Sequence, residues 1–119
     1  MQYGNNVYAK LYLFGSCLVR DDFNDIDILL IYNDQQIRAE DAYRFFKPML
    51  IKAQIDLNHP IHPMLLSEEE ERIMGYTKCE SMTFVSEIYF EDDIGGKIQT
   101  FVTQKFPNRL SKKPSLLCK

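Results

Sequence analysis

Hydrophobic residues fall into three short runs before residue 67, and each run predicts a strand of a β-sheet. The first run is AKLYLF at residues 9–14, and the second is DIDILLIY at residues 25–32. The second run first alternates polar and apolar residues and is then continuously apolar, which is typical of a strand buried on both faces at one end and open at the other. The third run is IHPMLL at residues 61–66, where Pro63 indicates an edge position or a distorted start.

Two segments between and after these strands have the features of helices. From about residue 38 to residue 54 the apolar residues recur at helical spacing, and Pro48 predicts a kink or a break near Lys47. Ser67 followed by four glutamates predicts a helix N-terminus, because Glu70 stands three residues after Ser67, as in a capping box. We therefore interpret SEEEER as structural rather than catalytic.

The segment after the second helix predicts a β-hairpin. Residues 87–90 and 97–102 are its two strands, and EDDIGG between them supplies a loop that contains glycine. The loop from Cys17 to Asn24 has only eight residues. A parallel crossover needs about a dozen or more, so the first two strands, if adjacent, are expected to pair antiparallel. Together these elements predict an α+β fold, with a small mixed β-sheet and helices on one side.

The composition is that of an ordinary globular domain of 119 residues, with 45% hydrophobic and 26% charged residues. No apolar run is long enough to cross a membrane, and the N-terminus lacks the pattern of a secretory signal. The three cysteines have no metal-ligand spacing, so we expect reduced thiols in a cytoplasmic protein. The domain is expected to cover residues 1–106, followed by a basic C-terminal tail at residues 107–119.

Charge changes this picture only near the C-terminus. The net charge of the chain is −3, which argues against bulk affinity for nucleic acid. The segment from Thr103 to Lys119 nevertheless has five basic residues and no acidic one. It is either a solvated tail or an arm that contacts phosphates or a partner.

The candidate chemistry lies in FGSCLVRDDFNDIDI, at residues 14–28. Asp25 and Asp27 are two positions apart on a predicted strand, so both side chains are expected on the same face. Antiparallel pairing of the first two strands would place Gly15 and Ser16 beside this acidic pair. The two short polar stretches are therefore expected to form one site.

Such a site is suited to a metal-bound phosphate. Two neighbouring carboxylates repel each other unless a cation lies between them, and their oxygens favour Mg²⁺ or Mn²⁺. A glycine lets a phosphate approach the backbone, and a serine hydroxyl and nearby amides can bind its oxygens. These residue types therefore indicate metal-dependent phosphoryl or nucleotidyl transfer.

The same residues resemble the signature of the DNA polymerase β-like nucleotidyltransferase superfamily. That signature is a hydrophobic residue, Gly-Ser, a short variable stretch and then Asp-hydrophobic-Asp-hydrophobic, and the resemblance covers about residues 9–75. The closest size class is that of the minimal nucleotidyltransferases, which include antitoxin-like members. The resemblance implies that Gly15 and Ser16 form the loop that binds the nucleotide phosphates. It also implies that Asp25 and Asp27 are the first two metal-binding carboxylates.

The family usually has a third carboxylate on the next strand, and the sequence leaves its position open. On the third predicted strand the matching residue is His62, in which case the carboxylate is missing. Asp56 is the other candidate for a catalytic carboxylate, although it can also belong to the last turn of the preceding helix. His59 and His62 are either metal ligands or ordinary loop residues. Arg20 and Arg38 are either phosphate contacts or solvated side chains.

Two functions from different classes follow. The first is a metal-dependent enzyme that moves a nucleoside monophosphate from an NTP to a hydroxyl acceptor, and the resemblance implies that a partner protein can be this acceptor. The second is a catalytically inactive homologue that works by binding, as an antitoxin or regulatory module. Because no separate substrate-recognition domain is present, we expect a partner chain or self-association. Asp56 within metal reach of the acidic pair favours the enzyme, whereas His62 in that place favours the binding module.

Overall fold

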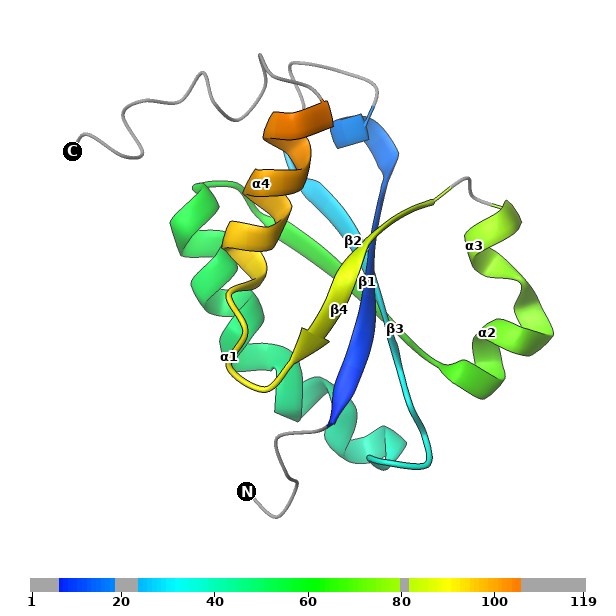
Figure 1. The fold of residues 1–119 in the computed structure, drawn as a ribbon. Coiled ribbons are helices and arrows are strands. Elements are labelled where there is room, and N and C mark those ends of the chain that lie inside the picture. The colour runs from blue at the N-terminus through cyan, green and yellow to red at the C-terminus, as the bar shows by residue number, and fades with distance from the viewer. Residues whose placement is uncertain (1–6, 19–23, 80–81, 106–119) are drawn as a thin grey trace.

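A mixed four-stranded sheet lies at the centre of the protein (Figure 1). The structure is a computed structural model and describes residues 7–18, 24–79 and 82–105, so the expected tail at residues 107–119 lies outside the described part. The strands are β1 (Tyr8–Phe14), β2 (Ile26–Tyr32), β3 (Ile61–Ser67) and β4 (Thr83–Tyr89). Their order is β3-β2-β1-β4, with β1 antiparallel to both of its neighbours and β2 parallel to β3.

The three strands predicted from the hydrophobic runs are all present, and each end agrees to within one residue. The predicted antiparallel pairing of β1 with β2 is confirmed. Pro63 lies in β3, which is an edge strand, where the missing amide of proline removes fewer ladder hydrogen bonds than in the middle of a sheet.

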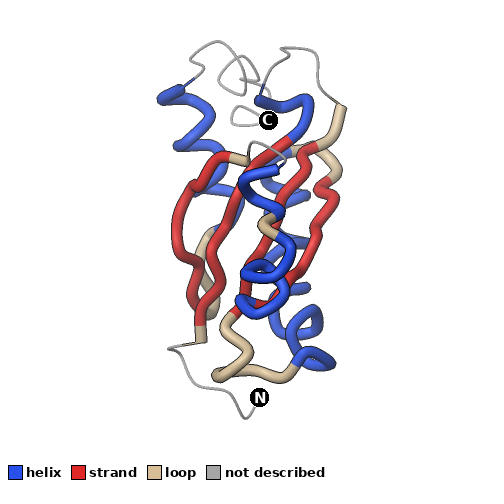
Figure 2. The backbone as a smooth tube through the Cα atoms, turned by 90° about the vertical axis from the view of Figure 1, so that its right-hand side faces the viewer, coloured by secondary structure: helices blue, strands red, loops and turns tan. Residues whose placement is uncertain are grey.

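Helices lie on both sides of the sheet. The two long helices, α1 and α4, cover one face, and the short helices α2 and α3 lie beyond the opposite face (Figures 1 and 2). The predicted α+β fold with a small mixed sheet is therefore confirmed, whereas the expectation of helices on one side only is wrong, because α2 and α3 lie beyond the second face. The helices are α1 (Ala39–Leu57), α2 (Glu68–Met74), α3 (Tyr76–Cys79), α4 (Ile94–Lys105) and one short 3-10 helix, η1 (Gly15–Leu18). None of the described helices combines the length and the apolar character needed to cross a lipid bilayer.

Alternation along β1 and β2 separates the two faces of the sheet. In β1, Leu11 and Leu13 are fully buried, whereas the residues between and beside them are partly exposed. Ile26 and Ile28 of β2 belong to the same core, under α1 and α4. The helices contribute Phe45, Phe46, Met49, Leu50, Ala53 and Leu57 from α1, and Ile94, Ile98 and Val102 from α4. Because alternate residues of a strand point to opposite faces, this core determines which residues of β2 face the other way.

Helix α1 runs unbroken through Pro48, so the break predicted near Lys47 does not occur. A proline inside a helix removes a backbone hydrogen bond and costs about 3 kcal/mol. Phe46 and Met49, on either side of Pro48, are both buried in the core. Tertiary packing of both halves of the helix against the sheet holds it in one piece, as is usual for helices in globular proteins.

The predicted β-hairpin near the C-terminus is wrong, because β4 is followed by a helix rather than by a second strand. The side chain of Asp93 accepts a hydrogen bond from the amide of Gly96 (3.0 Å), which satisfies a donor in the first turn of α4. Ile94, Ile98 and Val102 recur at helical spacing and are all buried. These residues form a helix because that conformation lets all three pack into the core.

The face of the sheet opposite α1 and α4 is covered only in part. Leu29 and Ile31 of β2 are buried on this face, outside the main core. The hydroxyl of Tyr8 donates a hydrogen bond to Glu68 of α2 (3.2 Å), and burial together with this carboxylate raises the pKa of Tyr8. Phe84 of β4, in contrast, is 47% exposed. Part of this face is therefore open to solvent.

The capping box predicted at the start of α2 is confirmed, and it can be tested. The Ser67 hydroxyl accepts from the amide of Glu70 (3.0 Å), and the Glu70 carboxylate accepts from the amide of Ser67 (2.8 Å). We expect Ser67→Ala to lower the free energy of unfolding by about 0.5–2 kcal/mol in urea denaturation, because a donor in the first turn loses its acceptor. Glu70→Gln keeps an acceptor at the same position and should cost less. A loss from Ser67→Ala no larger than that of this control would contradict the prediction.

Candidate metal centre

The acidic pair lies at the end of the sheet where β1 stops and β2 begins. Asp25 directly precedes β2, and Asp27 is the second residue of this strand. Because Ile26 and Ile28 are buried under α1 and α4, Asp27 points to the opposite face. The side chains of Asp25 and Asp27 are 37% and 29% exposed. Both carboxylates are therefore within reach of a ligand from solvent.

Gly15 brings the backbone after β1 directly against Asp27. Phe14, the residue before it, is the register partner of Asp27 in the antiparallel ladder. Gly15 has a φ of +85°, in the left-handed region, and a Cβ added to it would lie 2.4 Å from Oδ2 of Asp27. No other residue type fits here without displacing the carboxylate. The expected contact between the Gly-Ser turn and the acidic pair is thus confirmed for Gly15, while the side chain of Ser16 lies outside what the structure describes.

His62 lies beside the acidic pair on the neighbouring strand. It is the second residue of β3, and the parallel ladder pairs it in register with Asp27. Its Nδ1 atom is 3.4 Å from Oδ2 of Asp25 and 3.6 Å from Oδ1 of Asp27. The ring is 60% exposed. The imidazole therefore faces both carboxylates from a strand edge that solvent can reach.

Asp25, Asp27 and His62 form a group whose ligand atoms all lie within 4.8 Å of one another. Carboxylate oxygens and imidazole nitrogens are common protein ligands of divalent cations. A protonated imidazole can offset the negative charges of the pair, and a neutral one can share a cation with them. The arrangement can thus hold a metal ion, with open positions on the solvent side.

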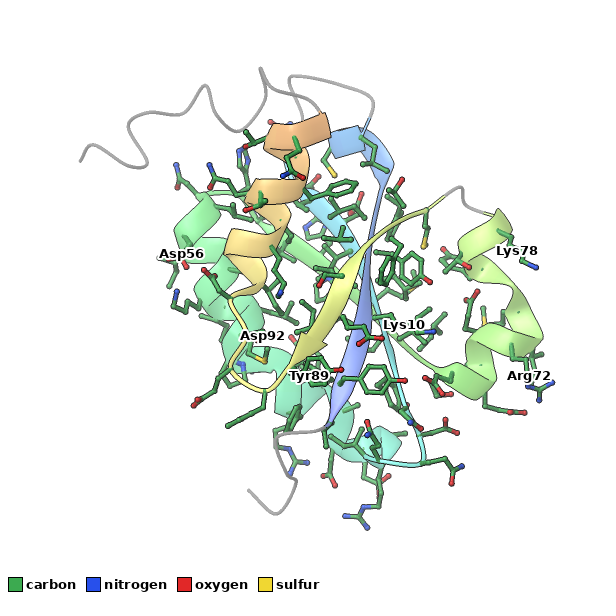
Figure 3. The ribbon with its side chains drawn as sticks, in the orientation of Figure 1. Lys10, Asp56, Arg72, Lys78, Tyr89 and Asp92 are labelled. Atoms are coloured by element: carbon green, nitrogen blue, oxygen red, sulfur yellow. The ribbon has the colours of Figure 1, made fainter. Side chains whose placement is uncertain are left out.

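Asp56, the sequence's other candidate for the third position, lies in the last turn of α1 (Figure 3). This helix covers the face of the sheet opposite to the one that Asp27 faces. Its carboxylate accepts a hydrogen bond from Nζ of Lys52 (2.7 Å), which raises the pKa of Lys52. Within the described part of the chain, Asp56 is not a member of the group formed by the acidic pair and His62. A catalytic role for Asp56 stays a prediction, and the residue beside the acidic pair is His62.

The other polar candidates lie elsewhere. His59 is buried, and its Nδ1 is 3.4 Å from the backbone oxygen of Asn24. Arg38 forms ion pairs with Glu40 and Asp41 at the start of α1. Arg20 lies outside the described residues.

His62 is the site residue that the sequence left undecided. The available signal is positional, because His62 follows the first residue of its strand just as Asp27 does. In-register parallel pairing then places the two side by side. The register of two parallel strands joined through a long helix is not encoded locally, so this signal could not decide between His62 and Asp56.

Comparisons with protein-family models, with curated proteins and with solved structures found no match for this chain. The described residues provide three ligand side chains, a glycine backbone in contact with one of them, and a side open to solvent.

The contact between Gly15 and Asp27 can be tested by a double-mutant cycle. We expect Gly15→Ala to destabilise the protein, because alanine is strained by about 1–2 kcal/mol in the left-handed region and its Cβ would meet the carboxylate. The strain is independent of Asp27, whereas the steric conflict is not. Gly15→Ala should therefore cost less free energy of unfolding in an Asp27→Ala background, measured by urea denaturation of all four proteins. Equal costs in the two backgrounds would show that the contact is absent.

Proposed function

We propose that this protein is a metal-dependent nucleotidyltransferase that moves a nucleoside monophosphate from an NTP to a hydroxyl acceptor. The observation that carries the proposal is the contact between the backbone of Gly15 and the carboxylate of Asp27 at the open end of the sheet. A carboxylate that can bind a cation lies there beside a turn whose amides can bind phosphate oxygens. This is the arrangement needed to hold a metal and a triphosphate together.

Each residue has a distinct part in this proposal. Asp25 and Asp27 would hold a divalent cation, expected from the sequence to be Mg²⁺ or Mn²⁺, and the cation would neutralise negative charge on the phosphates. Gly15 lets the turn lie against the carboxylate of Asp27, and Ser16 is expected to bind the phosphate oxygens. The acceptor oxygen forms a bond to the α-phosphorus, the bond from that phosphorus to the bridging oxygen breaks, and pyrophosphate leaves. The proton of the acceptor hydroxyl is released to water.

The order of these residues along the chain supports the same function. FGS followed by DIDILLIY resembles the signature of the DNA polymerase β-like nucleotidyltransferases. The acceptor is proposed to be a hydroxyl group on a partner protein, as the resemblance to minimal nucleotidyltransferases implies. Such a partner, or a second copy of the chain, would supply the recognition of the acceptor.

One observation favours a second candidate, a nucleotidyltransferase-like module that binds without transferring. His62, and not a carboxylate, is the register partner of Asp27 in β3, and Asp56 is paired with Lys52. This is the outcome that the sequence argument associates with a binding module. A site with one fewer negative charge stabilises the cation and the charge developing on the transferred group less well. In that case the protein acts as an antitoxin or regulatory subunit.

Metal and nucleotide binding give the first test. Under either candidate we expect a divalent cation with an NTP to raise the midpoint of thermal unfolding, because a ligand that binds only the native state stabilises it by mass action. The cation alone should shift the midpoint less, since the phosphates supply part of its ligands. Asp27→Asn should reduce the shift, and Asp34→Asn, an exposed carboxylate at the other end of β2, is the matched control. No shift in the wild type at millimolar concentrations would contradict the site.

Transfer itself separates the two candidates. For the enzyme we expect Asp27→Asn to keep the fold and to lower the rate of nucleotide transfer by about a hundredfold or more, because electrostatic stabilisation of the transferred group is lost. The measurement uses α-labelled NTP, a divalent cation and a cell lysate that supplies the acceptor. Asp56→Asn, assayed beside it, tests whether that carboxylate takes part. Labelled product that is equal in the wild type and in Asp27→Asn would exclude the catalytic assignment, and no product with intact partner binding would leave the binding module.

A further inference from the structure

We infer that His62 is a metal ligand and makes this site prefer a divalent transition ion between Fe²⁺ and Zn²⁺ in the first row to Mg²⁺. The inference rests on the metal site of the proposed function and not on its transfer step. In this inference, His62 determines which ion the two aspartates bind.

The donor atoms of the three side chains favour a transition ion over Mg²⁺. Mg²⁺ is a hard cation that takes oxygen ligands and keeps several waters, whereas imidazole suits iron, nickel, copper and zinc. Two carboxylates alone are ligands that Mg²⁺ accepts. A nitrogen from His62 at the third position supplies a donor that the transition ions bind well and Mg²⁺ does not.

The distances from the His62 nitrogen to the two carboxylate oxygens also fit a shared ion. Nδ1 of His62 is 3.4 Å from Oδ2 of Asp25 and 3.6 Å from Oδ1 of Asp27. Two ligand atoms that each lie about 2.0–2.2 Å from one ion, at a tetrahedral angle, are about 3.3–3.6 Å apart. The nitrogen therefore already stands from both oxygens at about the separation that a shared ion of this size requires.

The backbone holds the three ligands in this relation. The parallel ladder pairs His62 with Asp27 and Ile61 with Ile26, and both isoleucines are buried. A shift of β3 that moved His62 away would expose Ile61 or break the ladder. The exposed side of the imidazole and of the carboxylates leaves at least one ligand position for water or a phosphate oxygen, as in metal sites that act on substrates.

Direct metal binding tests the inference without any nucleotide. The whole chain, stripped of metal, is titrated with Co²⁺, whose visible absorption reports its ligands, and Mg²⁺ is then added as competitor. We expect one Co²⁺ to bind and Mg²⁺ to displace it only at a large excess. His62→Asp, which makes the site all oxygen, should weaken Co²⁺ binding and let Mg²⁺ compete more nearly as an equal. Proton NMR of the Co²⁺ form should show a strongly shifted imidazole N–H that this variant lacks.

Two further variants complete the experiment. Asp27→Asn should weaken Co²⁺ binding, and Asp34→Asn should leave it as in the wild type. Absorption from a Co²⁺–thiolate bond would show that a cysteine binds the ion, and would overturn the inference. Circular dichroism checks that each variant folds, and His62→Asn replaces His62→Asp if the added carboxylate prevents folding.

Several results would overturn the inference. They are displacement of Co²⁺ by an equal concentration of Mg²⁺, an unchanged preference in His62→Asp, or no Co²⁺ binding by the wild type. Different results would contradict the proposed function. A protein that binds Co²⁺ through His62 but transfers no nucleotide would uphold this inference and exclude the enzyme. A protein that transfers nucleotide with Mg²⁺ at the same rate after His62→Asp, and shows no Co²⁺ preference, would overturn this inference and uphold the enzyme.

Discussion

Strand β2 is hydrogen-bonded on both sides, and its two ladders determine the geometry of the whole site. The antiparallel ladder with β1 places Phe14 opposite Asp27, so that the next residue, Gly15, lies against the carboxylate. The parallel ladder with β3 places His62 opposite the same aspartate. A shift of one residue in the register of either ladder would turn the side chains of the shifted strand to the opposite face of the sheet. Both the contact with Gly15 and the pairing with His62 therefore depend on Asp27.

The buried side of β2 makes it possible for the exposed side to carry two neighbouring carboxylates. Ile26 and Ile28 are nearly fully buried under α1 and α4, and burial of such a side chain contributes about 1.5–3 kcal/mol. Repulsion between two unit charges about 4 Å apart near a protein surface costs about 4 kcal/mol. Burial of both isoleucines together offsets a cost of this size, so the strand remains in place while its polar edge stays available to a cation.

Where sequence-based prediction succeeded, the evidence was local. Alternation and apolar runs marked β1, β2 and β3, and the short connection between the first two strands favoured an antiparallel pair. The capping box at Ser67 involves residues only three positions apart. Prediction failed at α4 because the two glycines there were interpreted as a hairpin loop. Gly95 instead lets α4 approach α1 closely, since a Cβ added to it would lie 3.2 Å from the Cα of Ala53.

The sequence by itself determined the strands, the placement of Asp25 and Asp27 on one face, and the closeness of Gly15 to them. These features depend on the two-residue period of a strand and on a connection too short to cross over, which both act between near neighbours in the chain. Only the tertiary structure decided that His62 completes the group and that Asp56 lies on the other side of the sheet. The physical reason is that the register of β3 against β2 and the packing of α4 on α1 join residues that are far apart in the chain. This register and this packing are determined by the burial of apolar side chains across the whole core.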